Sequence, residues 1–267
     1  MTDTCPAALS VNLNKVALIR NSREGDFPSL VEFGTLAMEA GAAGLTVHPR
    51  PDQRHIRPGD VIRLATLLRN WPEAEFNIEG NPFAAAHGTY PGMLALVEQT
   101  RPHQATLVPD SNDQLTSDHG FDLRVSADSL KPIIAQLRDI GCRICLFMDP
   151  DLDQISRARD LGVDRIELYP GPYAEHWNDP HRLPALFEQY QAAAVHAGEI
   201  GLGVNAGHDL NLENLPLFSS LPGLLEVSIG HALTVDALRM GMTSAVKAYL
   251  KALGHKRSGH KAPGDMV

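Results

Sequence analysis

Short apolar runs rich in β-branched residues alternate with amphipathic segments of helical period along most of the chain, and this alternation strongly restricts the possible folds. The candidate strands cover residues 10–16, 44–49, 75–80, 105–110, 143–149, 165–171, 201–207 and 224–230. The candidate helices cover residues 28–42, 59–70, 132–141, 151–162, 183–201 and 234–253, the third beginning at Pro132 because proline suits a first helical turn. Alternating strands and helices predict a parallel sheet covered by helices.

The number of strand–helix units predicts the fold class. Eight units within 267 residues, without a change of composition that would mark a linker, predict one (β/α)₈ TIM barrel domain over residues 1–267. A doubly wound open sheet is the weaker alternative, because no glycine-rich fingerprint follows the first strand. The polar segment 254–267 contains glycine and proline, and we expect it to form a flexible tail.

Composition limits the partners and the compartment. The net charge of −9, without an extended basic stripe, argues against a nucleic-acid partner. No run approaches the roughly 18 apolar residues of a membrane span, and the N-terminus lacks the charged and apolar regions of a signal peptide. The three cysteines provide no disulfide framework. We therefore expect a cytoplasmic protein with neither membrane nor nucleic-acid partners.

Polar residues at alternate strand positions indicate a functional site. Strands of a covered parallel sheet are usually continuous apolar runs, and a buried polar group without a partner costs about 1–3 kcal/mol. Here polar or small residues recur at every second position, mostly toward the carboxyl ends of the strands: Asn12 and Asn14; Thr46, His48 and Arg50; Asn77 and Glu79; Arg165, Glu167 and Tyr169; Asn205 and Gly207; Glu226, Ser228 and Gly230. Barrel enzymes build their sites at this end, so we interpret these positions as a catalytic mouth, with a structural polar core as the alternative.

Residues after the seventh and eighth candidate strands predict an anion site. Gly207 and His208 follow one strand, and Gly230 and His231 follow the other, where phosphate-binding barrels hold the anion through backbone N–H groups. Asp209 would repel an anion here, so we expect its side chain to turn away and cap the next helix. Turn glycines beside surface histidines are the alternative.

A second group of basic residues follows the second candidate strand. His48 and Arg50 share a strand face, and Arg54 and His55 lie in the following loop. Since the guanidinium group binds phosphate in a bidentate manner, this group predicts a second anion site. Other arginines are assigned as follows: Arg57 and Arg63 to a solvated helix surface, and Arg20 and Arg23 to either phosphate contact or solvent.

Three titratable residues from three strands predict proton transfer. His48, Glu79 and His208 could divide proton removal and donation if their surroundings separate their pKa values. They could instead bind a metal ion, but the sequence lacks a paired His-x-His or multi-carboxylate pattern and the nearby arginines disfavour a dication. We therefore expect acid–base chemistry without a metal.

An ordered set of motifs resembles one known family over nearly the whole chain. The motifs are "VNLNKVALIRNSR", "GLTVHPRPDQRHI", "FNIEGN", "TLVPD", "QLTSDHG", "IELYPGPYA", "VNAGHDL" and "SIGHAL". They are similar to the PdxJ family of vitamin B6 biosynthesis, the pyridoxine 5′-phosphate synthases. The resemblance implies a barrel with additional helices, assembled as a homo-octamer, that uses no metal or organic cofactor. The implied reaction condenses 3-amino-2-oxopropyl phosphate with 1-deoxy-D-xylulose 5-phosphate to give pyridoxine 5′-phosphate, phosphate and water.

The resemblance also implies residue roles. His48 and Glu79 correspond to proton acceptors, and His208 corresponds to a proton donor. The residues implied to hold the aminooxopropyl phosphate are Asn12, Arg23, Asp209, Gly230 and His231. Those implied to hold the deoxyxylulose phosphate are Asn14, Lys15, Arg50, His55 and Thr116.

The chain departs from the family pattern at three positions. Asn14 and Lys15 stand where an Asp-His pair is familiar, and Asp209 stands where a glycine often follows the histidine. We expect altered substrate contacts there rather than lost activity. Two other functions stay open: a metal-dependent sugar-phosphate aldolase or epimerase on the same barrel, and a non-catalytic sensor of phosphorylated metabolites.

Overall fold

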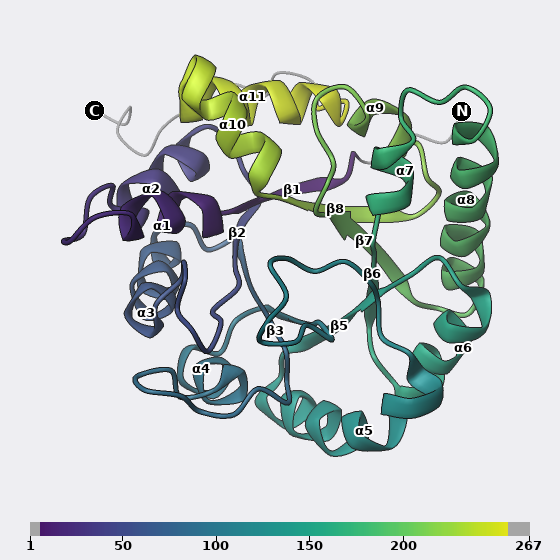
Figure 1. Cartoon of the computed structure of the whole chain (residues 1–267), viewed down its shortest axis with the longest axis horizontal. Helices are drawn as coiled ribbons and strands as arrows, with labels where there is room; N and C mark the ends of the chain where they lie inside the picture. The colour runs from purple at the N-terminus through teal and green to yellow at the C-terminus, as the bar shows by residue number, and fades with distance from the viewer. Residues whose placement is uncertain (1–5, 256–267) are drawn as a thin grey trace.

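Eight parallel strands form a closed barrel in which each strand pairs with its neighbours along the chain (Figure 1). The structure is a computed structural model that describes residues 6–255. Strand β8 pairs with β1 and closes the ring, with Leu9 opposite Val227. The strands are β1 Ala8–Asn12, β2 Gly44–Val47, β3 Glu75–Gly80, β4 Gln104–Leu107, β5 Arg143–Met148, β6 Arg165–Leu168, β7 Gly203–Gly207 and β8 Leu224–Ile229. The predicted (β/α)₈ barrel is confirmed.

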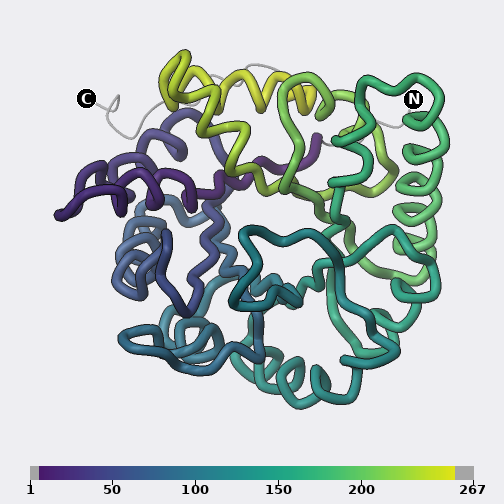
Figure 2. The backbone as a smooth tube through the Cα atoms, viewed as in Figure 1, coloured from purple at the N-terminus to yellow at the C-terminus, as the bar shows by residue number. Residues whose placement is uncertain are grey.

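Helices surround the barrel, and Figure 2 follows the chain from strand to strand around the ring. The helices are α1 Asn14–Asn21, α2 Leu30–Glu39, α3 Pro58–Leu67 with the 3₁₀ turn η1 Leu68–Asn70, α4 Met93–Thr100, α5 Leu123–Ile140, α6 Leu152–Leu161, α7 Gly171–Glu175, α8 Leu183–Glu199, α9 Leu215–Phe218, α10 His231–Met240 and α11 Met242–Ala252. Local signals set many of the ends. In α6, for example, Asp151 accepts hydrogen bonds from two backbone N–H groups of the first turn, and Gly162 ends the helix with a left-handed backbone.

Three predicted boundaries are wrong. Helix α5 begins at Leu123 and runs through Pro132, because Asp122 caps it and burial of its apolar face outweighs the one hydrogen bond that proline removes. Strand β1 ends at Asn12, and Asn14 already begins helix α1. The predicted helix 234–253 is two helices, broken at Gly241 with φ 84°. Of the predicted tail 254–267, residues 256–267 lie outside the described residues.

The barrel interior is polar, whereas the outer face of each strand is apolar. In β1, Leu9 and Val11 are buried against the helices, while Ser10 points inward and its hydroxyl lies 2.7 Å from that of Thr46. Thr106 donates to the Asn77 side chain at 3.0 Å. At the amino-terminal end, Arg143 pairs with Glu75 and Arg165 pairs with Glu226, the last two at 3.3 Å. The lower layers therefore form a structural polar core, as the alternative interpretation proposed for these strands, and most of its polar groups have partners, although the Gln104 side-chain N–H group has none among the described residues.

A fully buried ion pair connects helix α1 with the first turn of helix α3. The Arg20 side chain of α1 has no exposed surface and donates to Asp60 of α3 at 2.7 Å and to the backbone carbonyl of His55 at 3.0 Å. Asn21 donates to the same carbonyl at 2.8 Å. Arg20 is therefore a structural residue that fixes the loop carrying His55; it contacts neither the cavity nor solvent, and a supporting role, to which the family resemblance reduces it, agrees with this position.

Replacing Arg20→Met should destabilise the protein strongly. The change leaves the buried Asp60 carboxylate with the half-exposed Arg63 as its remaining ion-pair partner, and breaking a buried pair costs about 3–5 kcal/mol. Urea unfolding measures the loss. The matched control Arg63→Gln removes an exposed partner of the same carboxylate and should cost less than about 1 kcal/mol. Equal losses in both variants would contradict this assignment.

Candidate active site

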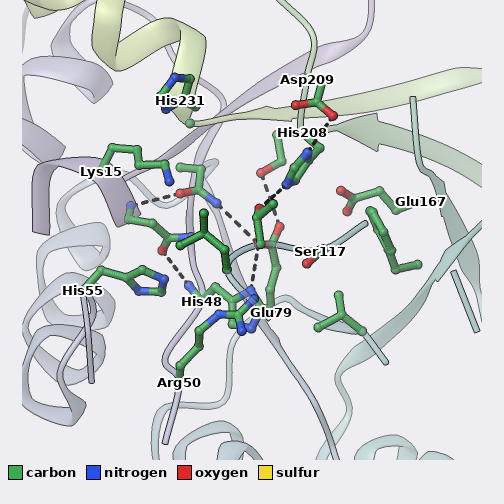
Figure 3. Close-up of a pocket in the computed structure, with 18 residues that line it drawn as sticks. Lys15, His48, Arg50, His55, Glu79, Ser117, Glu167, His208, Asp209 and His231 are labelled. Atoms are coloured by element: carbon green, nitrogen blue, oxygen red, sulfur yellow. Dashed lines mark hydrogen bonds and ion pairs between the residues drawn. The ribbon is translucent and has the colours of Figure 1, made fainter. Parts of the chain in front are cut away.

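A cavity of about 290 Å³ opens at the carboxyl ends of the strands. Its lining residues come from strand ends and from the loops that follow them: Asn12, Asn14, Lys15, His48, Arg50, His55, Glu79, Val108, Leu115, Thr116, Ser117, Phe147, Glu167, His208, Asp209, Ser228, Gly230 and His231. Every predicted site residue except Arg23 lines this cavity. Figure 3 shows Lys15 and His55 on one side of the pocket and Glu167 on the other, with Glu79 between them.

One end of the cavity is crowded with cationic side chains. Burial and the charges of Arg50 and Arg54 lower the pKa of Lys15 below its usual value. Burial, Arg50 and Lys15 lower the pKa of His55 to about 3, so this imidazole is neutral at physiological pH. The Ile56 N–H donates to His55 Nδ1 at 2.9 Å, which leaves the ring proton on Nε2 as a donor. A bound dianion would relieve the mutual repulsion of these groups.

A second anion-binding arrangement lies between β8 and α10. Gly230 precedes the first residue of α10, His231, so the unpaired N–H groups and the positive end of the helix dipole face the cavity mouth. Asn12 packs against this turn, and a Cβ atom on Gly230 would lie 3.0 Å from the Asn12 side-chain oxygen. The absence of a side chain at Gly230 therefore permits this close approach.

Between the two ends lies a buried pair of titratable groups from β3 and the segment after β2. His48 Nδ1 is 4.0 Å from Glu79 Oε2, and Asn12 donates to the same oxygen at 3.4 Å. Burial and the nearby charges of Asp110 and Glu226 raise the pKa of Glu79 to about 8. Burial and the charge of Arg50 lower the pKa of His48 well below its usual value. At neutral pH the pair therefore consists of a largely protonated carboxyl group beside a neutral imidazole.

His208 enters the cavity from the opposite side, directly after β7. Its backbone has φ 40°, a left-handed conformation that costs a non-glycine residue about 1 kcal/mol or more and redirects the side chain. Its Nε2 lies 2.7 Å from the Thr116 hydroxyl, and its Nδ1 lies 3.0 Å from Asp209 Oδ2. The expectation that Asp209 caps the next helix is wrong, because α9 begins only after Asn214.

Glu167 also faces the cavity; its position on β6 placed it among the polar residues of the mouth, without a specific role. This β6 carboxyl group is buried, with only 4% of the residue's surface exposed. Burial and the charges of Glu79 and Glu226 raise its pKa well above the usual value, which favours the protonated form. The alternation of Arg165, Glu167 and Tyr169 was a signal for it, but alternation alone does not distinguish the mouth from the core.

Arg23 is the one predicted site residue that lies outside the cavity lining. It follows the end of α1 in an exposed turn, where its backbone N–H donates to the Arg20 carbonyl.

Within residues 6–255, no group of three or more histidine, cysteine, aspartate or glutamate residues is arranged to hold a metal ion. No helix in the described part of the chain is long and apolar enough to cross a membrane.

Distant structural relatives share the barrel fold. The tryptophan synthase alpha chain from Legionella pneumophila matches with a TM-score of 0.63 at 12% identity, covering 98% of this chain and 94% of that chain. A 4-hydroxy-2-oxoglutarate aldolase/2-deydro-3-deoxyphosphogluconate aldolase matches with a TM-score of 0.57 at 14% identity, covering 92% of this chain and 94% of that chain. At such low identity these similarities show the fold alone.

Sequence relatives match far more closely. The pyridoxine 5′-phosphate synthase of Albidiferax ferrireducens is 50% identical over 252 residues, covering 94% of this chain and 98% of that protein. The pyridoxine 5′-phosphate synthase of Xanthomonas axonopodis pv. citri is 51% identical over 253 residues, covering 94% of this chain and 97% of that protein. The family model "Pyridoxal phosphate biosynthesis protein PdxJ" matches residues 9–255, and the chain therefore belongs to the PdxJ family.

Proposed function

We propose that this chain is a pyridoxine 5′-phosphate synthase that condenses 3-amino-2-oxopropyl phosphate with 1-deoxy-D-xylulose 5-phosphate by general acid–base catalysis. The observation that carries the proposal is one cavity with anion-binding groups at two ends and titratable groups between them. A reaction of two phosphorylated substrates needs this arrangement, because both phosphates must bind while protons move at the atoms between them.

The substrate assignments follow the two ends. We assign the deoxyxylulose phosphate to the cationic end, lined by Asn14, Lys15, Arg50, His55 and Thr116. We assign the aminooxopropyl phosphate to the end at α10, with Asn12, Asp209, Gly230, His231 and, from outside the present lining, Arg23. Opposite placement of the phosphates directs the amine and ketone groups toward Glu79 and His48 at the centre.

The proton-transfer roles follow from protonation states. Imine formation between the amine and the ketone, and the later loss of water and phosphate, require repeated proton removal and donation. The neutral imidazole of His48 can accept a proton, and Glu79, with a pKa of about 8, can exchange one near neutral pH. His208 across the cavity would donate a proton to a departing hydroxyl group. No metal or organic cofactor enters this scheme.

The assembly and compartment complete the proposal: a single-domain subunit of a cytoplasmic homo-octamer. Support for association comes from exposed apolar side chains on two contacting helices, Leu18 and Ile19 of α1 and Leu238 and Met240 of α10. Light scattering on the purified protein measures the mass, and a monomer at micromolar concentration would contradict this part.

Purified protein incubated with both phosphorylated substrates should form pyridoxine 5′-phosphate. The variants Glu79→Gln and His208→Asn should each lower kcat by about 10²–10⁴-fold, because each removes a proton-transfer group. Both variants should still bind phosphate ligands, which calorimetry measures. The control His181→Asn, on an exposed loop, should keep the wild-type rate. Wild-type rates in both site variants would remove the mechanism. Activity that vanishes with a chelator and returns with a divalent ion would favour the metal-dependent alternative.

The raised pKa of Glu79 should make stability fall as pH rises. Between the ordinary pKa of 4.5 and the folded-state value of about 8, the folded chain keeps a proton that the unfolded chain loses. The contribution is thus complete below about pH 4.5 and lost by about pH 8. We expect Glu79→Gln to reduce the loss between about pH 5 and pH 8 by about 2–4 kcal/mol, measured by urea unfolding. The exposed control Glu98→Gln should leave the slope unchanged, and an unchanged slope in Glu79→Gln would contradict the prediction.

A further inference from the structure

Arg54 connects two loops above the barrel without lining the cavity. It lies between β2 and α3, and its guanidinium group reaches residues 112–115 between β4 and α5. Nη1 donates to the backbone carbonyls of Gln114 at 2.8 Å and Leu115 at 3.2 Å, and Nη2 donates to that of Asn112 at 3.1 Å. Nε donates to Asp52 at 2.6 Å, so four of its five N–H groups already have protein partners.

The segment held by Arg54 supplies part of the cavity wall. Leu115, Thr116 and Ser117 line the pocket, and the Thr116 hydroxyl contacts His208. The Leu115 side chain is 85% exposed, so burial of this side chain does little to fix the segment. Hydrogen bonds from a charged donor are stronger than neutral ones, which makes Arg54 a major constraint on where Thr116 lies.

Asp52 orients the arginine for this task. Its Oδ2 atom accepts from Arg54 Nε, and its Oδ1 atom accepts from the Arg54 backbone N–H at 3.1 Å. The side chain of Arg54 is only 24% exposed. Three carbonyl oxygens around one planar group match the fork of a guanidinium and exceed what a lysine ammonium can reach in one position.

We propose that Arg54 is a positioning residue, which holds residues 112–115 over the cationic end of the cavity and thereby sets Thr116 against His208 and the deoxyxylulose phosphate. This inference rests on the proposed function for its substrate. Arg50 lines the cavity, pairs with Asp110 and adds one hydrogen bond to the Gln114 carbonyl at 3.3 Å, whereas Arg54 lies outside the lining and donates to three carbonyls of the segment. Arg54 therefore acts on the reaction through the segment and not by direct contact with phosphate.

The test compares Arg54→Gln, Arg54→Lys and the control Arg69→Gln, an exposed arginine after α3. Hydrogen exchange of the amides of residues 111–118, in the absence of substrates, should accelerate at least 10-fold in both Arg54 variants and stay unchanged in the control. The KM for the deoxyxylulose phosphate should rise at least 10-fold in both, with a change below threefold in the KM for the other substrate. Because Arg54→Lys keeps the positive charge, fast exchange and a raised KM in this variant would show that the planar guanidinium group, and not the charge alone, holds the segment.

The outcomes separate this proposal from the proposed function. Unchanged exchange in residues 111–118 of Arg54→Gln, or full rescue by Arg54→Lys, would overturn it. If the wild-type protein lacks synthase activity, the exchange measurement still decides whether Arg54 holds the segment. Should Arg54→Gln fold poorly, Asp52→Asn retains the arginine but loses its orienting carboxylate, and it should change exchange and KM in the same direction by a smaller factor.

Discussion

Burial of charged and acidic side chains inside the closed barrel is the constraint on which the site depends. Parallel strands alternate inward and outward residues, so every inward polar group is removed from water and must find a partner or change its protonation state. At the amino-terminal end, Arg143 and Arg165 provide partners for Glu75 and Glu226. At the carboxyl end, neither Glu79 nor Glu167 pairs with a lysine or arginine within residues 6–255, and their pKa values are raised. The glutamates of the lower layer are therefore paired with arginines, whereas the two glutamates of the reactive layer are not.

Burial also shifts the pKa values of the basic groups at the cationic end of the cavity, but it lowers them instead of raising them. Arg20, paired with Asp60, fixes the backbone at His55 from outside the cavity, and Lys15, Arg50 and His55 line this end together. Their pKa values are lowered because burial and like charges disfavour the protonated forms. A phosphate dianion at this end would favour the protonated form of Lys15 and the charge of Arg50, because it adds an attraction to each cation. The buried ion pair thus supports binding by holding the neutral His55 imidazole, a hydrogen-bond donor, beside Lys15 and Arg50.

The sequence predicted the barrel and most of the cavity because both depend on alternation within short strands. All eight strands are present, and the polar residues near their carboxyl ends converge as expected. Features that depend on distant partners could not be predicted in this way. Helix α5 begins nine residues before Pro132 because its apolar face finds a surface to cover. Asp209 lies beside His208 instead of capping a helix, since the backbone at His208 adopts a left-handed conformation.

Arg50 and Arg54, the two arginines after β2 nearest the cavity, differ in their hydrogen-bond partners and therefore in their roles. In the sequence Arg50 and Arg54 are equivalent candidates for phosphate binding, four positions apart in one short stretch. In the structure Arg50 faces the cavity beside Asp110, whereas the guanidinium of Arg54 is occupied by three carbonyl oxygens and Asp52. A group with one free N–H cannot bind phosphate in a bidentate manner without releasing the loop it holds. Direct phosphate binding by Arg54 would therefore open the cavity wall that keeps the substrate beside His208.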